Sequence, residues 1–247
     1  MLACLARAAF LSLALSVAPA AAKAGDLADF NALVEAAAAH NRVAIFYLRT
    51  GNTDLAGLEL DGLRAAWSKV TERFAGKRPD PFDGNAVYVT VMTDIGLRLV
   101  TADMMLNAGR ADAARTALVG VRDNLYRLRR SAGIAVLADC VRDANAAMDA
   151  LYAFDGKASD KSLDWSTPAT AQTIAGRAAV YRHELERCDT MAADVVRKNP
   201  EFRRLIDGAK VSLDLMGKAI ADKDNDLLHR ILIELRSFDN LLAFRYG

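Results

Sequence analysis

The sequence predicts an all-α fold, an antiparallel helical bundle built from repeated helical hairpins. First, only five Pro and 15 Gly in 247 residues leave long stretches without a helix breaker. Second, apolar residues recur at alternating spacings of three and four, as on the buried face of a helix. Third, one short unit recurs three times, which is typical of stacked or bundled hairpins.

The repeated unit consists of a short polar loop, an aspartate that would start a helix, and an arginine ten residues later. Its residue pairs are Asp54 and Arg64, Asp112 and Arg122, and Asp226 and Arg236. A fourth, looser copy is an open alternative, with Thr167 in place of the aspartate and Arg177 at the same offset. The repeat therefore predicts three or four hairpin units.

Two interpretations fit the first residue of each unit. In one, carboxylates converge at one end of the bundle and bind a metal or another ligand. In the other, each residue caps a helix N-terminus and each arginine pairs at the bundle surface. Aspartate is common at that position for purely local reasons, so we favour caps. The predicted cap residues are Asp54, Asp112, Thr167 and Asp226.

The apolar periodicity places the individual helices. One stripe consists of Leu60, Leu63, Trp67, Val70 and Phe74, and similar stripes follow in the later segments. The predicted helices cover residues 27–49, 54–75, 86–107, 112–130, 134–154, 168–196, 201–222 and 226–245. Short loops between most of them imply antiparallel neighbours, and we expect residues 25–247 to form a single all-helical domain.

The N-terminus is typical of a secretory signal peptide over residues 1–24. Arg7 precedes an apolar stretch from Ala8 to Val17, and small residues offer cleavage after Ala22 or Ala24. An uncleaved membrane anchor is the alternative, but the apolar run is short. No later segment has the length and hydrophobicity of a membrane span, so we expect a periplasmic protein.

Charge argues against a nucleic-acid partner. Loss of Arg7 with the signal peptide leaves 31 basic and 31 acidic residues, so the processed chain has a net charge near zero. Such a balance predicts no electrostatic attraction to nucleic acid or to an anionic membrane surface.

Two cysteines, Cys140 and Cys188, remain after processing. An even number of cysteines in an oxidising compartment predicts a disulfide, and these two lie on helices expected to be antiparallel. Two buried free thiols are the alternative.

Signals for cofactors and catalysis are weak. Neither cysteine belongs to the Cys-x-x-Cys-His motif of covalent haem attachment, and His40, His183 and His229 are isolated on their helices. Asp94 and Arg98, four residues apart, are expected to form a structural ion pair. No nucleophile, base and orienting group can be assembled, so the sequence predicts neither a bound cofactor nor an enzyme.

The last two helices resemble the final hairpin of periplasmic four-helix cytochromes of the c-prime type. The resemblance covers the segment 216–224 and the amphipathic helix that ends at 237–245. In that family the last helix carries the haem-binding cysteines and histidine, whereas Phe238, Leu241 and Leu242 stand there in this chain. The resemblance thus implies a bundle and a compartment, but no haem ligand.

These observations predict an exported, non-enzymatic binding or interaction protein. Its partner would be a periplasmic protein or an apolar ligand held along a helical groove. The alternative is a periplasmic bundle that holds haem or a metal non-covalently.

Overall fold

The computed structural model describes residues 21–156 and 163–247, and their regular structure is entirely helical. This confirms the predicted all-α class and its antiparallel hairpins, which are α1 with α2, α3 with α4, and α5 with α6. Residues 1–20, the greater part of the predicted signal peptide, lie outside the described residues.

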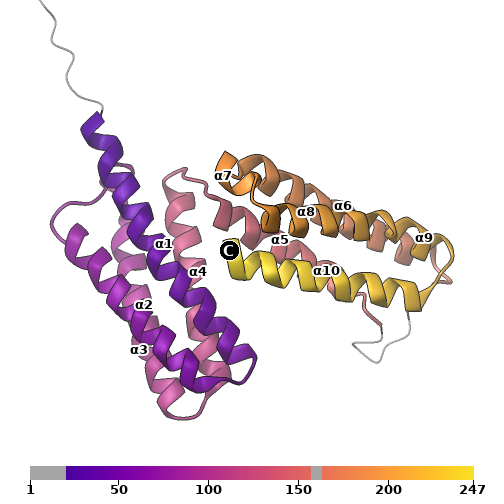
Figure 1. The fold of residues 1–247 in the computed structure, drawn as a ribbon, viewed down its shortest axis with the longest axis horizontal. Coiled ribbons are helices and arrows are strands. Elements are labelled where there is room, and N and C mark those ends of the chain that lie inside the picture. The colour runs from indigo at the N-terminus through magenta and orange to yellow at the C-terminus, as the bar shows by residue number, and fades with distance from the viewer. Residues whose placement is uncertain (1–20, 157–162) are drawn as a thin grey trace, which may run out of the picture.

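Two groups of helices lie side by side (Figure 1). The first, here called the N-terminal bundle, comprises α1 (Ala21–Arg49), α2 (Thr53–Phe74), the short 3-10 helix η1 (Asp80–Phe82), α3 (Ala86–Asn107) and α4 (Ala111–Ser131). The second, the C-terminal bundle, comprises α5 (Leu137–Tyr152), α6 (Pro168–Met191), α7 (Asp194–Arg197), α8 (Pro200–Asp214), α9 (Met216–Ala221) and α10 (Asn225–Tyr246).

Each bundle buries its own apolar cluster. The stripe from Leu60 to Phe74 is buried among α1, η1, α3 and α4, as its spacing predicts. The C-terminal cluster is built around Tyr181, Phe202 and Leu235. The assignment of residues 25–247 to one domain stays a prediction, because two clusters in contact can unfold together or one after the other.

The repeated loop of the sequence is a compact helix-to-helix turn. Gly51, Gly109 and Lys223 each adopt a left-handed backbone, with φ of 79°, 69° and 53°. The amide of the next residue then bonds to a carbonyl in the last turn of the preceding helix, as in the bond of 2.9 Å from Asn52 to Tyr47. One helix therefore ends and the next begins within a few residues.

This turn shifts the helix starts away from the predicted caps. The cap positions belong to Asn52, Arg110 and Asp224, and the side chains of Asn52 and Asp224 accept backbone amide protons there. Asp54, Asp112 and Asp226 lie two residues later, inside the first turn. The prediction was wrong because a carboxylate favours both positions, in the first turn through the helix dipole.

The fourth predicted cap is correct in position only. Thr167 precedes Pro168 at the start of α6, but its hydroxyl makes no capping bond to the backbone. That hydroxyl instead lies 3.1 Å from the hydroxyl of Thr170. The N-terminus of α6 therefore lacks the side-chain acceptor that the sequence suggested.

Two predicted helices are shorter than expected. The segment 168–196 leaves the helix at Ala192, whose ψ of 129° is extended, and resumes as α7. The segment 201–222 is divided at Leu215 into α8 and α9. Apolar periodicity continues through both breaks, so the pattern could not reveal them.

The predicted disulfide joins the first hairpin of the C-terminal bundle. Cys140 of α5 is bonded to Cys188 of α6, with their Cα atoms 5.4 Å apart. Both residues are buried in the C-terminal cluster. A disulfide of this kind is consistent with an oxidising compartment.

Candidate functional site

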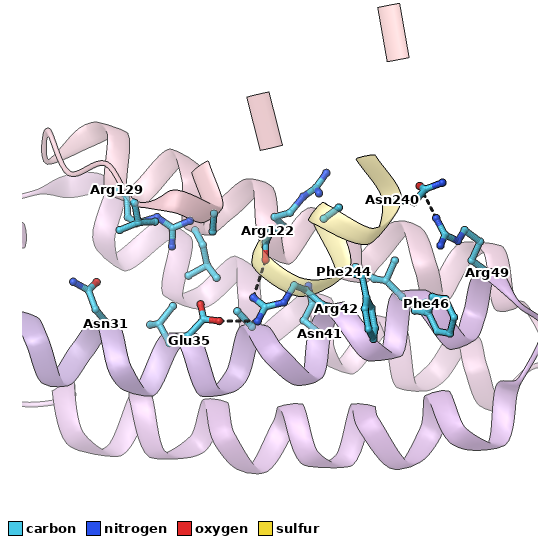
Figure 2. Close-up of a pocket in the computed structure, with 18 residues that line it drawn as sticks. Asn31, Glu35, Asn41, Arg42, Phe46, Arg49, Arg122, Arg129, Asn240 and Phe244 are labelled. Atoms are coloured by element: carbon cyan, nitrogen blue, oxygen red, sulfur yellow. Dashed lines mark hydrogen bonds and ion pairs between the residues drawn. The ribbon is translucent and has the colours of Figure 1, made fainter. Parts of the chain in front are cut away.

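A cavity of about 250 Å³ lies where the two bundles meet. Its walls come from α1, α4, the start of α5 and the end of α10 (Figure 2). α10 reaches this place because its C-terminal turns contact α1 (Figure 1). Segments from both ends of the chain thus form one site.

Most of the wall is apolar. Val34 and Ile45 of α1 face the cavity together with Leu125 of α4. Phe46 and Phe244 close one end, with ring centroids 5.0 Å apart, and lie side by side in Figure 2. An apolar concave surface with a few fixed polar groups is the usual form of a small-molecule site.

Four arginines interrupt this apolar wall, and two of them are neutralised by carboxylates. Arg42 donates to Glu35 Oε1 at 2.6 Å and to the Gly247 carbonyl at 2.7 Å. Arg129, which is 8% exposed, forms a forked pair with Asp139 through hydrogen bonds of 2.5 to 3.0 Å. Both guanidinium groups therefore have their counter-charge in place.

The other two arginines bond to amide oxygens. Arg49 donates to Asn240 Oδ1 at 2.7 Å, and Arg122 donates to Asn145 Oδ1 at 3.0 Å. Within the described part of the chain, neither guanidinium has a carboxylate within 4.0 Å. The cavity wall therefore carries two guanidinium groups whose hydrogen bonds go to neutral amides, and Asp123, Asp239 and Asp149 act on the charge of Arg122 without an ion-pair contact.

Arg122 is the more buried of these two. Burial is the largest influence on its guanidinium and lowers its pKa from the usual value. Its Nε is buried and has no hydrogen-bond partner among the described residues. A buried N–H without an acceptor costs free energy that a bound acceptor would recover.

Asn41 is a second buried polar side chain on the cavity wall. Its side chain is on the cavity wall and only 3% exposed, with Nδ2 donating to the Leu118 carbonyl at 3.2 Å. That carbonyl lies one helical turn before Arg122 on α4. Asn41 Oδ1 has no partner among the described residues.

A buried polar network supports Arg122 from the C-terminal bundle. Asn145 of α5 accepts from Arg122 and donates to Asp239 Oδ1 at 2.7 Å. Asp239 is 1% exposed, and Arg236 donates to it at 3.3 Å. Burial raises the pKa of Asp239 to about 6. The position of Arg122 thus depends on a carboxyl group inside the neighbouring bundle.

The repeated arginines therefore differ in role. Arg64 lies at the surface, 3.7 Å from Asp103, as predicted. Arg177 is exposed as well. Arg122 and Arg236 instead meet the same buried network from opposite bundles. The sequence alone could not distinguish them, because the four occupy equivalent places in the repeated unit.

The predicted pair of Asp94 and Arg98 does not form. Asp94 instead accepts from Arg127 of α4 at 3.1 Å. The guanidinium of Arg98 lies against Gly120, where an added Cβ would be 1.9 Å from it. The absence of a side chain at Gly120 on the neighbouring helix leaves room for the Arg98 guanidinium. The i, i+4 spacing rule considers one helix alone and therefore missed this contact.

The histidines stay apart. His40 bonds to Glu59 and His229 to Asp155, each at 2.7 Å, whereas His183 is exposed on α6. Over residues 21–156 and 163–247, no three His, Cys, Asp or Glu side chains are close enough to hold a metal ion. The repeated aspartates Asp54, Asp112 and Asp226 are exposed and form no such group.

One signal in the sequence could have revealed the site. The buried stripe of α1 contains Phe30, Val34, Ala37, Ala44 and Leu48 at helical spacing. Asn41 occupies the central position of that stripe, where an apolar residue is expected. A polar residue in the middle of a buried face indicates either a buried partner or a ligand.

No helix in the described parts of the chain has both the length and the hydrophobicity needed to cross a membrane. No known protein family, curated protein sequence or solved structure is significantly similar to this chain.

Proposed function

We propose that this chain is an exported, non-enzymatic binding protein that holds a small, largely apolar molecule in the cavity between its two bundles. The observation that carries this proposal is the combination of an apolar wall with two buried polar atoms, Asn41 Oδ1 and Arg122 Nε, that have no partner among the described residues. Native interiors rarely leave such atoms unpaired unless a ligand or water completes them.

The size of the cavity limits the ligand. A cavity of about 150 Å³ in another protein holds benzene. On that scale, the 250 Å³ found here accommodates about ten non-hydrogen atoms. The ligand would therefore be a single substituted ring or a short branched chain.

The proposed location is the periplasm. It is supported by the signal-peptide pattern of residues 1–24 and by the disulfide between Cys140 and Cys188. Intact mass of the exported protein should show an N-terminus at Lys23 or Gly25. Retention of Met1 on a membrane-bound product would contradict this assignment.

The binding proposal is tested with a panel of small neutral aromatic molecules and the corresponding acids. Binding is measured by calorimetry and by chemical-shift changes of the amide groups that line the cavity. Ala38 lines the cavity, so Ala38→Leu should fill part of it and weaken every ligand of the panel at least about tenfold. Ala36→Leu, at an exposed position of the same helix, is the matched control.

Two results would contradict the proposal. One is the absence of binding by any member of the panel. The other is binding that Ala38→Leu leaves unchanged, because the ligand would then sit elsewhere. The haem- or metal-binding alternative would instead give a stoichiometric Soret band after haem addition, or one metal lost on replacing His183 or His229 by alanine.

A further inference from the structure

We infer that two copies of this chain associate through the outward side of α3, with the two α3 helices antiparallel about a two-fold axis between Gly96 and Leu97. This surface is separate from the cavity, because no residue of α3 lines the cavity wall. α3 lies beside α2, on the side of the N-terminal bundle away from the C-terminal bundle (Figure 1). The inference therefore goes beyond the proposed function.

The charged residues of α3 are turned toward its neighbours within the bundle. There are three of them, Asp94, Arg98 and Asp103, and all are partly buried. Asp94 accepts from Arg127 of α4 at 3.1 Å, and the guanidinium of Arg98 also lies against α4. Asp103 lies 3.7 Å from Arg64 of α2. A surface helix normally directs its charges to solvent, so α3 has the opposite arrangement.

The solvent side of α3 is apolar as a result. Every exposed residue of this helix is uncharged, and its four large apolar side chains there are 52 to 61% exposed. α2, which is equally long, instead exposes charged side chains from Asp54 to Arg73. The surface, here called the α3 face, consists of Val89, Thr93, Gly96, Leu97, Val100 and Met104.

The α3 face is complementary to itself, as a two-fold interface requires. Its six residues form three pairs centred on the same point between Gly96 and Leu97. In an antiparallel arrangement, Leu97 of each copy then lies over Gly96 of the other. A Cβ added at Gly96 would meet no atom within 4 Å, so this position has room for the leucine. The other pairs across the interface are Val89 with Met104 and Thr93 with Val100.

The area of the α3 face is sufficient for a weak dimer. Its exposed side chains present about 500 Å² on each copy, near the upper limit for an apolar patch on a monomer. A symmetric pair would bury about 1,000 Å² in total, which is the lower limit for a specific interface. We therefore expect reversible association with a dissociation constant of about 10 to 100 μM.

The charges near the α3 face favour a second copy over a lipid surface. Helices that lie on membranes carry lysines and arginines along the polar side, where these attract anionic headgroups. The one basic residue of α3, Arg98, lies against α4, and the other two charges of the helix are carboxylates. An uncharged second copy of the same face meets no such mismatch.

Sedimentation equilibrium of the exported protein tests the association at pH 7.5, from about 1 to 300 μM, a range that brackets the expected constant. Val100→Glu places a carboxylate in the centre of the interface and should weaken the dimer at least about tenfold. Val180→Glu on α6 is the matched control and should leave the constant unchanged. The two valines are 54% and 49% exposed, so both variants should keep the fold, which thermal unfolding of dilute protein checks.

Cysteine cross-linking tests the orientation of the two helices. Chains with Val89→Cys, mixed with chains with Met104→Cys, should form an intermolecular disulfide under mild oxidation. Neither variant should cross-link to itself, because equivalent positions lie about 22 Å apart along antiparallel helices, far beyond the reach of a disulfide.

Three results would overturn the inference. The first is a monomer at every concentration, whether or not the α3 face then binds vesicles of phosphatidylcholine or another protein. The second is a dimer that Val100→Glu leaves intact, because a different surface would form it. The third is cross-linking of Val89→Cys to itself, which an antiparallel pair excludes. Val100→Glu should leave ligand affinity of the cavity unchanged, so failure of the dimer and failure of the proposed function are distinguishable.

Discussion

The side-chain amide of Asn145 donates a hydrogen bond of 2.7 Å to Asp239 Oδ1 in the interior of the C-terminal bundle. The carbonyl of the same amide accepts from Arg122, which belongs to the N-terminal bundle and lines the cavity. One asparagine thus connects a buried acid of one bundle to a partly buried arginine on the cavity wall. These three residues therefore couple the interior of the C-terminal bundle to the wall of the cavity.

The ionisation of Asp239 should make stability depend on pH. Burial raises its pKa to about 6, above the ordinary value of 3.8, so between these values the folded chain binds more protons than the unfolded chain. The free energy of unfolding should therefore gain about 2 kcal/mol as pH falls from 7.5 to 4.5, and lose it as pH rises through 6. Urea unfolding at both pH values measures the change.

Asp239→Asn isolates this effect from the other groups that titrate in the same range. The variant should be more stable than the unaltered chain at pH 7.5, and this advantage should vanish at pH 4.5. Asp112→Asn removes an exposed carboxylate of the N-terminal bundle that does not act on Asp239, so it should leave the pH profile unchanged. Identical profiles for Asp239→Asn and the unaltered chain would contradict the assignment.

Loss of the disulfide should destabilise the C-terminal bundle. The bond closes a loop with a sequence separation of 48. In the chain-entropy account, a loop of this length stabilises the folded state by about 4 kcal/mol. Cys140→Ala with Cys188→Ala should show this loss in urea unfolding. Reduction of the unaltered chain, which keeps both sulfur atoms in the core, controls for lost packing; equal stability before and after reduction would refute the prediction.

Loss of one partner of the buried Arg129–Asp139 pair should lower the free energy of unfolding strongly, whereas replacement of both partners by apolar residues should lower it only a little. It joins the end of α4 to the start of α5, and both residues are less than 10% exposed. Asp139→Ala leaves the buried Arg129 guanidinium without its carboxylate partner and should lower the free energy of unfolding by about 3 to 5 kcal/mol. The double variant Arg129→Met with Asp139→Leu should recover most of that loss.

A matched surface pair provides the control. Asp112→Ala breaks the exposed pair with Arg115, at 3.5 Å on the same helix α4, and should cost under about 1 kcal/mol. Similar losses for Asp139→Ala and Asp112→Ala would show that burial of the Arg129 pair has no energetic consequence.

Asn41→Leu should stabilise the ligand-free protein. The substitution removes a buried acceptor that has no partner in the described chain and extends the apolar stripe of α1. We expect a gain of about 1 kcal/mol in thermal or urea unfolding. Asn145→Leu is the contrasting variant, because both ends of that amide are bonded, and it should destabilise by about 1 to 3 kcal/mol. A loss of stability in Asn41→Leu would show that this amide is needed by the fold itself.

Residue spacing and cysteine count were enough to predict much of the fold. The stripe from Leu60 to Phe74 predicted both a helix and its buried face, since helical periodicity follows from backbone geometry. The count of cysteines predicted the bond from Cys140 to Cys188. The three predicted aspartate caps were wrong by two residues, because an aspartate stabilises the first turn of a helix as well as the cap position.

The site depended on tertiary structure. Arg122 and Arg64 occupy equivalent places in the repeated unit, yet only Arg122 lies at the junction of the bundles. Its partner Asn145 and the cavity residue Asn41 lie on different helices, and no sequence spacing relates them. The sequence by itself determined the helices, their buried faces and the disulfide, because these depend on residues close along the chain or on composition. Only the tertiary structure decided which polar side chains share the interior, because that depends on how two bundles pack against each other.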